Sequence, residues 1–404
     1  MQTKYGSGVI APDQRMGSGG GGAPAAIVGA HETPYTRHPA EGRDTRSYLA
    51  EAVAGALADA GIEHAAVDGL GVSSFSLAPD HAIDLAWRLG LHVRWLMDDA
   101  NGGAGALNML GHAVRAIEAG DAETIVLVSG DHLDRAAFRT LVEQYNRATA
   151  DELVPLGYAG PNALFAMLTQ RYADEHGLTR EDLACIPIAQ RWWAGRNPGA
   201  VYREPLTLED YLAAPYVAEP LTRYDCVPVV TGADAVVVSA APARRRRGAA
   251  PHVRVRAVAA LHNPDDQQGD GVHPGFAEVA ARLWPVAGAG PGDVDAAFLY
   301  DDYPVMALVQ AAELGLVPGG DLAGWLHRDL LERRWPLNTS GGQLSAGQAG
   351  AAGGMHGLVE AVHQLRGRAG ERQTPASLAL VAGYGMVLYR HGACHNAAVL
   401  ERIG

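Results

Sequence analysis

Short apolar runs alternate along the chain with longer stretches that place apolar residues at helical spacing. The runs at residues 25–30, 67–72 and 124–130 have the length and composition of buried strands. Between them, residues 47–60 show the spacing of a helix, and the Gly/Ala-rich stretch 102–120 predicts another helix. Strands that alternate with helices in this way predict an α/β fold.

The same order of elements returns in the second half of the chain. A strand preceded by Val-Asp, a helix and a later strand ending in glycine each have a counterpart there. The matched segments are 67–72 with 294–300, 112–120 with 359–367, and 127–130 with 380–383. A repeat on this scale predicts two duplicated halves.

The repeat divides the chain into four expected segments. Residues 1–23 form a Gly-rich flexible tail without the apolar block of a signal peptide or anchor. Residues 24–243 form the N-terminal half, with an inserted loop region, and residues 251–404 form the C-terminal half. The segment 244–250 is an Arg-rich linker between them. We expect its arginines to be solvated; the alternative is a phosphate contact for a nucleotide-bearing ligand, and nothing local decides between the two.

The charge balance argues against two classes of partner. The 404 residues include 32 Lys and Arg against 45 Asp and Glu, a formal net charge of −13. Binding to nucleic acid or to an anionic membrane depends on clustered positive charge, so neither is expected. Hydrophobic residues make up 48% of the chain, enough for a large core. They form no run of about 18 apolar residues that could cross a membrane.

The cysteines also narrow the range of functions. Cys185, Cys226 and Cys394 share no CxxC motif or Cys/His cluster. The sequence therefore predicts neither a disulfide framework nor a metal site. A reducing, cytoplasmic location fits this cysteine usage best.

A succession of motifs in the middle of the chain is similar to the thiolase superfamily, in the branch of the sterol-carrier-protein thiolases and the acetyl-CoA acetyltransferase-like proteins. The motifs are residues 158–167, 171–183, 197–198, 218–221, 224–228 and 232–236. The resemblance extends over residues 25–404. It implies a five-layered αβαβα fold, a homodimer, and a coenzyme A thioester as substrate with no bound cofactor. In several branches it also implies a small zinc-ribbon/OB-fold partner protein.

The groups that such thiolases use for Claisen chemistry are replaced in this chain. The nucleophilic cysteine at the start of the first central helix matches Ala100, or Asn101 if the match moves by one residue. The histidine of the Gly-His-Pro motif matches Gln348, whose amide can donate to an oxyanion but cannot act as a base near neutral pH. A third catalytic position matches Val381 or Ala382. Acyl transfer through a cysteinyl enzyme is therefore not expected.

The sequence Tyr300-Asp301-Asp302-Tyr303 follows the predicted strand 296–299. A tyrosine in its first position resembles the thiolase-like retro-aldolases of steroid side-chain degradation, which lack the cysteine and cleave a β-hydroxyacyl-CoA. The resemblance implies acid/base work for Tyr300, oriented by Asp301 or Asp302. A tyrosine base would need hydrogen-bond donors around its phenolate to lower its pKa from about 10. Those aldolases carry a second tyrosine where this chain has Gln348, and Tyr384 is our candidate to replace it.

Each of these residues also has a purely structural interpretation. Tyr300 and Tyr303 could be packed tyrosines with a satisfied hydroxyl. Asp301 and Asp302 could cap the helix that begins near Pro304.

The residues ahead of the two Gly-rich helices are open to two interpretations as well. Asn101 and Gln348 occupy matching places there, as capping groups or as part of an oxyanion or substrate site. Cys226 lies in a structural segment of the family and is expected to be a buried small residue rather than a nucleophile.

Three functional hypotheses follow, and an enzyme is favoured among them. The first is a cysteine-independent lyase that makes or breaks a C–C bond in an acyl-CoA by aldol chemistry. The second is a noncatalytic thiolase-like subunit that supports a partner enzyme. The third is an atypical acyltransferase or condensing enzyme of secondary metabolism, acting on an acyl-CoA or a carrier-protein thioester.

Overall fold

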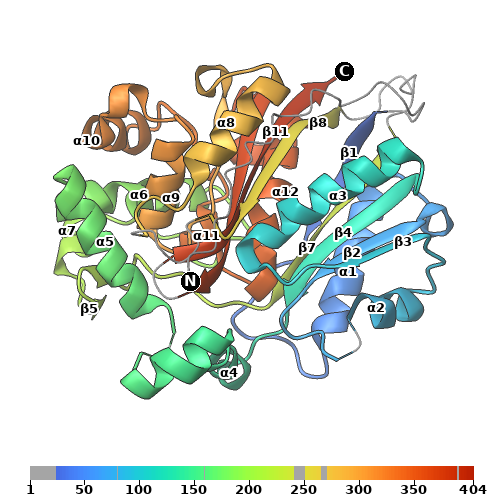
Figure 1. Cartoon of the computed structure of the whole chain (residues 1–404), viewed down its shortest axis with the longest axis horizontal. Helices are drawn as coiled ribbons and strands as arrows, with labels where there is room; N and C mark the ends of the chain where they lie inside the picture. Colours follow the sequence, from blue (N-terminus) through green and yellow to red (C-terminus); the bar gives the residue numbers. More distant parts are fainter. Residues whose placement is uncertain (1–23, 80, 159, 241–250, 265–270, 389–390) are drawn as a thin grey trace, which may run out of the picture.

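The computed structural model describes residues 24–79, 81–158, 160–240, 251–264, 271–388 and 391–404. The predicted tail (1–23) and the predicted linker (244–250) lie outside them. A nine-stranded sheet runs through the molecule in the order β3-β2-β4-β7-β1-β8-β11-β10-β9 (Figure 1). Its strands are β1 (Ala25–Glu32), β2 (Gly69–Ser73), β3 (Trp95–Asp98), β4 (Thr124–Asp131), β7 (Gly232–Ala240), β8 (His252–His262), β9 (Ala296–Phe298), β10 (Leu378–Leu388) and β11 (His391–Ile403).

The sheet repeats one topology twice, in mirror order. In the N-terminal half, β2 is parallel to β3 and β4, while β7 is antiparallel to β4 and β1. In the C-terminal half, β9 is parallel to β10, and β11 is antiparallel to β10 and β8. An isolated parallel bridge between Ala297 and Leu337 takes the place that β3 has in the first half. The predicted duplication is therefore visible in the strand order.

Two helices fill the space between the halves of the sheet. α3 (Gly105–Ala119) and α12 (Gly353–Leu365) share one buried cluster with strands of both halves. A second cluster lies under α1 (Thr45–Ala60) and α2 (His81–Leu89) on the outer face of the N-terminal half. A third lies under α8 (Phe276–Ala287) and α9 (Pro304–Glu313) on the outer face of the C-terminal half. The layers therefore follow the predicted αβαβα order. The two halves of the sheet are joined by β1 and β8, which pair through two residue pairs.

Small residues let the two central helices approach closely. A Cβ atom placed on Gly354 would lie 2.6 Å from the carbonyl oxygen of Gly103, so only glycine fits there. Polar contacts also connect the halves at this point. The carboxylate of Asp131 accepts a hydrogen bond from the Ala351 N–H (2.8 Å), and the Asn396 amide donates to the Ala104 carbonyl (2.7 Å). The helix starts are thus held by the opposite half of the chain.

The segment between β4 and β7 forms a helical region beside the sheet (Figure 1). It contains α4 (Arg135–Glu143), α5 (Asn162–His176), α6 (Arg180–Ala194), α7 (Leu208–Ala213) and the hairpin β5 (Tyr216–Ala218)–β6 (Leu221–Thr222). Reciprocal capping boxes start α6 at Thr179 and α7 at Thr207. Further along, α10 (Leu322–Gly324) and α11 (Gly342–Ala346) precede α12. Among the described residues, no helix is long and apolar enough to cross a membrane.

Candidate active site

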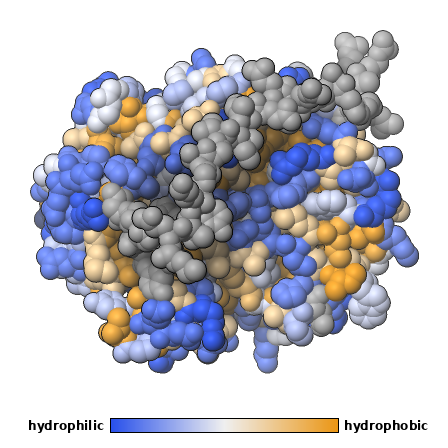
Figure 2. Space-filling model, viewed as in Figure 1, coloured by the Kyte–Doolittle hydropathy of each residue, from blue (hydrophilic) through white to orange (hydrophobic). Residues whose placement is uncertain are grey.

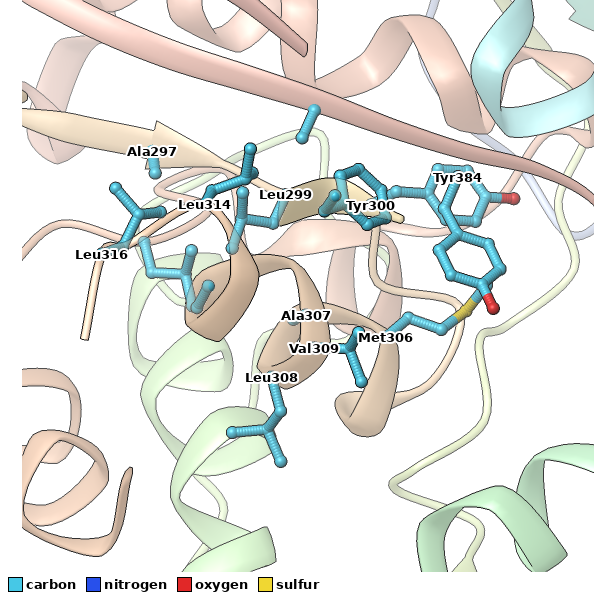
Figure 3. Close-up of a cluster of buried hydrophobic side chains, with 14 of the residues drawn as sticks. Ala297, Leu299, Tyr300, Met306, Ala307, Leu308, Val309, Leu314, Leu316 and Tyr384 are labelled. Carbon is cyan, nitrogen blue, oxygen red and sulfur yellow. The ribbon is translucent and has the colours of Figure 1, made fainter. Parts of the chain in front are cut away.

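A cavity of about 650 Å³ lies between the helical region and the starts of the two central helices. Apolar side chains from α4, α5 and α9 form much of its wall, including Phe138, Leu141, Val142, Leu164, Phe165 and Met306. Figure 3 shows Tyr300 and Tyr384 at one end of the buried cluster that α9 and β9 contribute, with Met306 beside them. Asp302 and Gln348, which also line the cavity, lie beside Tyr300 at this end.

Three of the polar side chains that line the cavity form one hydrogen-bonded network. The Tyr300 hydroxyl donates to Oδ2 of Asp302 at 3.0 Å. The Gln348 amide Nε2 donates to Oδ1 of Asp302 at 2.5 Å and to the Tyr300 hydroxyl oxygen at 3.1 Å. All three residues line the cavity. The sequence motif that follows β9 and the residue ahead of α12 therefore meet.

Backbone contacts hold this network in place. Tyr300 lies just beyond β9, where the Gln310 side chain accepts from its N–H (3.1 Å) and donates to its carbonyl (2.7 Å). The Gln348 N–H donates to the Pro228 carbonyl, and the Gln348 carbonyl accepts from the Val230 N–H. Tyr300 and Gln348 are thus fixed by main-chain bonds as well as by their side chains.

Burial raises the pKa values of both Asp302 and Tyr300, but to different levels. It raises the pKa of Asp302 to about 7, with a smaller contribution from the neighbouring Asp301 carboxylate, and hydrogen bonds from Tyr300 and Gln348 oppose the rise. Burial, together with the Asp302 charge, raises the pKa of Tyr300 well above its usual value. The hydrogen bond that Gln348 donates to the Tyr300 hydroxyl lowers this pKa, but not enough to offset burial and the Asp302 charge. Tyr300 therefore keeps its proton at neutral pH, and Asp302 is the group that titrates there.

The start of the first central helix brings a glycine, Gly103, to this network. It lies in a 3-10 turn (Gly102–Ala104) that leads into α3, and a Cβ atom on it would lie 2.2 Å from Cε2 of Tyr300. The residues that the sequence pointed to are placed elsewhere. Ala100 is exposed, and neither it nor Asn101 lines the cavity. The Asn101 amide donates to Asp99, and its oxygen accepts from the Cys394 thiol.

The two helix starts also correct the expected equivalence of Asn101 and Gln348. Gly102 and Gly350 open the two 3-10 turns with similar positive φ angles of 56° and 59°. With these glycines matched, Gln348 corresponds to Ala100 in the repeat. Neither predicted residue caps its helix through its side chain.

The remaining motif residues have different positions. Asp301 is buried away from the large cavity, where its carboxylate accepts from the Gln343 N–H at the start of α11 (3.0 Å). Tyr303 lines the cavity, stacks on Phe165 with ring centroids 4.6 Å apart, and donates to Asn162 (2.6 Å). α9 begins at Pro304 without a side-chain cap, so neither aspartate caps it.

Tyr384, in β10, lines the cavity with its ring, and its hydroxyl oxygen accepts from the Gly392 N–H at 2.9 Å. It packs against Phe276 and His395. No hydrogen bond connects it to Tyr300 or Asp302 among those found in the described part of the chain. The structure therefore places it in the wall of the cavity, beside the network rather than within it.

Comparison with known proteins connects this geometry to a family. Residues 257–401 match the model of the "Thiolase C-terminal domain-like" family. The chain is 34% identical to the 17-hydroxy-3-oxo-4-pregnene-20-carboxyl-CoA lyase of Mycobacterium tuberculosis, over 85% of this chain and 92% of that protein. The chain belongs to the thiolase superfamily. It is also 32% identical to a steroid side-chain-cleaving aldolase of Thermomonospora curvata, over 85% of this chain and 90% of that protein.

A solved structure shares the architecture of this chain. The structure named "Ltp2-ChsH2(DUF35) aldolase" superposes with a TM-score of 0.80 at 28% identity, covering 94% of this chain and 98% of that chain. The expected thiolase fold and the expected likeness to the aldolase branch are both confirmed.

Among the described residues that line the cavity, none offers an activated thiol. Cys226 is the cysteine found among these described residues. Burial and the neighbouring Asp225 raise the pKa of the Cys226 thiol to about 12. Nucleophilic attack requires the thiolate, so Cys226 is inert at neutral pH. A reaction in this cavity has to use oxygen and amide groups.

Sequence reasoning missed Tyr145, which also lines the cavity. It packs edge-on against Phe75 with ring centroids 5.7 Å apart, and its hydroxyl lies 2.8 Å from the position of a Cβ atom on Gly102. Burial and the Asp302 charge raise the pKa of Tyr145, so its hydroxyl keeps its proton. It comes from the segment after α4, which carries no motif that the sequence could have shown.

Proposed function

We propose that this member of the thiolase superfamily is a lyase that cleaves or forms a C–C bond in a β-hydroxyacyl-CoA by aldol chemistry, without a covalent intermediate. The observation that carries the proposal is the network of Asp302, Tyr300 and Gln348 at the end of a cavity whose cysteine is inert. A carboxyl group with a pKa of about 7 next to a hydroxyl that keeps its proton is a matched base and acid.

In the cleavage direction, the Asp302 carboxylate takes the proton of the β-hydroxyl group. The C–O bond becomes a carbonyl, the Cα–Cβ bond breaks, and its electron pair forms the enolate of the shortened thioester. Tyr300 then donates its proton to Cα, and the protonated Asp302 returns a proton to Tyr300 across their 3.0 Å hydrogen bond. Cα thus receives the Tyr300 proton, and the β-hydroxyl proton replaces it on Tyr300, so the products are a ketone or aldehyde and a shorter acyl-CoA, with no other reactant.

The enolate oxygen needs positive electrostatic potential, and the starts of the two central helices supply it. Gly103 and Gly350, from the turns ahead of α3 and α12, both line the cavity. The N-terminal ends of helices carry a partial positive charge. Preorganised dipoles of this kind stabilise a developing oxyanion. Gln348 holds Asp302 and Tyr300 in their relative positions.

The size and lining of the cavity support a bulky apolar acyl group. A volume of about 650 Å³ with walls of Phe, Leu, Val and Met is suited to a large hydrocarbon skeleton. Both similar enzymes carry steroid side-chain chemistry or a pregnene skeleton in their names. We infer that steroid-like β-hydroxyacyl-CoA thioesters are the first substrates to examine.

We also infer that the chain works as an assembly. α2 and the edge strand β3 expose Ile83, Trp87 and Leu96, with 62%, 76% and 40% of these side chains accessible. Figure 2 shows apolar surface in this region. An exposed apolar patch next to an unpaired strand edge supports a homodimer through this edge. The name of the similar aldolase pairs two components, which supports a further DUF35-type partner, the expected zinc-ribbon/OB-fold protein.

A mass-spectrometric assay tests the lyase function. The purified protein, alone and with a co-encoded DUF35-type protein, is incubated with steroid-like and simple β-hydroxyacyl-CoA thioesters, and with carrier-protein thioesters as a separate arm. We expect a shortened acyl-CoA, no acyl adduct on the protein, and loss of cleavage in Tyr300→Phe. Tyr303→Phe is the matched control, since its hydroxyl bonds to Asn162 outside the network. Binding without cleavage in either arrangement would overturn the proposal in favour of a noncatalytic subunit.

A further inference from the structure

A second cluster of polar side chains lies in the core, outside the cavity. It joins Glu32 at the end of β1, Asp234 in β7 and His356 in α12. One ligand atom from each of the three lies within 4.8 Å of the other two. Asp234 and His356 are 0% and 2% exposed, and the Glu32 side chain is 19% exposed. The cluster takes no part in the proposed aldol reaction.

The contacts within the cluster leave one buried oxygen without a partner. Nδ1 of His356 lies 2.6 Å from Oε2 of Glu32. The Tyr35 hydroxyl donates to Oδ2 of Asp234 at 2.8 Å, but Oδ1 of Asp234 has no hydrogen-bond partner. An unpaired carboxylate oxygen in a dry core is costly, so a positive group opposite it would be strongly favoured.

The geometry points to a binding site for one divalent transition-metal ion of the Zn²⁺ or Mn²⁺ class, held by Glu32, Asp234 and His356. Without an ion, the pKa of His356 is raised to about 9 by Glu32 and Asp234, and burial raises that of Asp234, so the cluster holds protons. A metal ion would displace them, and the two carboxylates and the neutral imidazole would then carry a charge of −2 that the ion neutralises. One nitrogen and two oxygen ligands without sulfur suit Zn²⁺ or Mn²⁺, whereas Mg²⁺ prefers oxygen ligands alone.

The surroundings of the histidine suit a ligand role. Nε2 of His356 lies 2.7 Å from Oγ of Ser340, so an Nε2–H that donates to this oxygen leaves the Nδ1 lone pair toward the carboxylates. Outer partners of this kind orient metal-binding histidines. Zn²⁺ ligands lie about 2.0–2.2 Å from the ion, so Glu32 would have to move back from Nδ1. Glu32 has room for this movement, because its other oxygen, Oε1, faces Gly199, which has no side chain. A Cβ atom added to Gly199 would still lie 3.4 Å from Oε1.

Arg372 does not neutralise the cluster in place of an ion. Its electrostatic effect reaches Glu32, but its guanidinium is paired with Glu360 at 2.9 Å. Tyr35, which bonds to Asp234, packs against Gly347, the residue before Gln348. An ion in the cluster would therefore stabilise the wall behind the Gln348 segment.

The test measures metal content and thermal stability of the full-length protein. The protein is stripped with EDTA, incubated with ZnCl2, MnCl2 or MgCl2, passed through a desalting column and analysed for metal and Tm. We expect about one Zn²⁺ or Mn²⁺ per chain with a raised Tm, and no retained Mg²⁺. Asp234→Asn should abolish retention. Asp225→Asn is the matched control, because Asp225 is equally buried and also accepts from a tyrosine hydroxyl, that of Tyr211.

A spectroscopic measurement keeps the test independent of the folding of the variants. Electron-spin-echo spectra of the unsubstituted protein with one equivalent of Mn²⁺ should show coupling to a single histidine nitrogen. Either of two results would overturn the site: wild-type protein that retains no Zn²⁺ or Mn²⁺ and shows no change in Tm, or equal retention by Asp234→Asn and Asp225→Asn. Each readout is independent of lyase activity, so failure of this inference leaves the proposed function untouched.

Discussion

A Cβ atom on Gly103 would lie 2.2 Å from Cε2 of Tyr300, far inside van der Waals contact. The tyrosine ring therefore fills the space into which any side chain at the start of the first central helix would extend. A nucleophile at position 103 and a tyrosine at position 300 exclude each other, because both need the same volume. This relationship requires glycine at position 103 and places the Tyr300 ring directly against the start of the helix.

The first prediction uses that contact. Gly103→Ala should displace the Tyr300 ring, because the added methyl group has no free volume. We expect a loss of stability of about 1–3 kcal/mol, the usual cost of overpacking, and a loss of cleavage activity. Ala100→Cys places a thiol at the position that the sequence match suggested, and it should change neither property, because Ala100 is exposed outside the cavity. Thermal melts and the cleavage assay check both; an acyl adduct on Ala100→Cys would contradict the placement.

The second prediction concerns the pH dependence of the rate. Asp302 must be ionised to act as the base, and its pKa is raised to about 7. kcat/KM should therefore rise with pH through about 7 and then level off. Tyr300 has to keep its proton, and since its pKa lies well above the usual value, no decline should appear below about pH 10. Asp302→Asn should lower kcat by about 10²–10⁴-fold and remove the rise. A rise that persists in Asp302→Asn would assign the base to another group.

The same carboxyl group should leave a signature in stability. Its folded-state pKa of about 7 is above the value of about 4 in an unfolded chain, so the folded state holds the proton more tightly. This contribution favours folding below about pH 4 and is lost as the pH rises through about 7. Asn keeps the shape of Asp302 without the buried charge: its oxygen can accept from the Tyr300 hydroxyl, and its amide can donate to the oxygen of a Gln348 amide in the flipped orientation. Asp302→Asn should thus melt higher than the unsubstituted protein at pH 8, and this gain should disappear toward pH 4. Denaturant titrations at the two pH values measure it.

The sequence predicted the architecture well because the signals behind it are local and repeated. The alternation of strands with helices, the duplicated order and the Gly-rich central helices all follow from short-range patterns, and the structure shows each of them. The position of the Tyr300 motif at a strand end was predictable for the same reason. Gln348 was harder to place, because its partners depend on contacts with the 228–230 segment, more than 100 residues away in the chain.

The differences between the expected site and the geometry have physical causes of the same kind. Asn101 was expected in the site because it precedes a Gly-rich helix, but the positive φ of Gly102 turns the chain so that Gly103 faces Tyr300. Tyr300 was expected to do acid/base work, and a base role would have needed a lowered pKa; burial, which no sequence pattern displays, raises the pKa instead. Glu32, Asp234 and His356 are separated by 202 and 122 residues, so no ligand spacing could have revealed their cluster.

The fourth prediction tests the cavity as the acyl site. Val142, in α4, lines the apolar wall away from the Tyr300 network. Val142→Trp should fill part of the volume, raise KM for bulky β-hydroxyacyl-CoA thioesters by at least about tenfold, and leave short-chain thioesters unaffected. Steady-state kinetics with both substrate classes checks it. An equal effect on short and bulky thioesters would instead indicate a disturbed network or fold, which the melting temperature would reveal.

The last prediction concerns the dimer edge. Trp87 on α2 is 76% exposed, although a large aromatic side chain on a stable monomer would usually be covered. If β3 and α2 form the interface, Trp87→Glu should place a charge into it and shift the protein from dimer to monomer without lowering the stability of the monomer fold. Light scattering coupled to size-exclusion chromatography measures the mass of each form. Val286→Glu is a matched control, since Val286 is 59% exposed on α8, on the far half of the sheet. A dimer that survives Trp87→Glu but dissociates in Val286→Glu would move the interface to the C-terminal half.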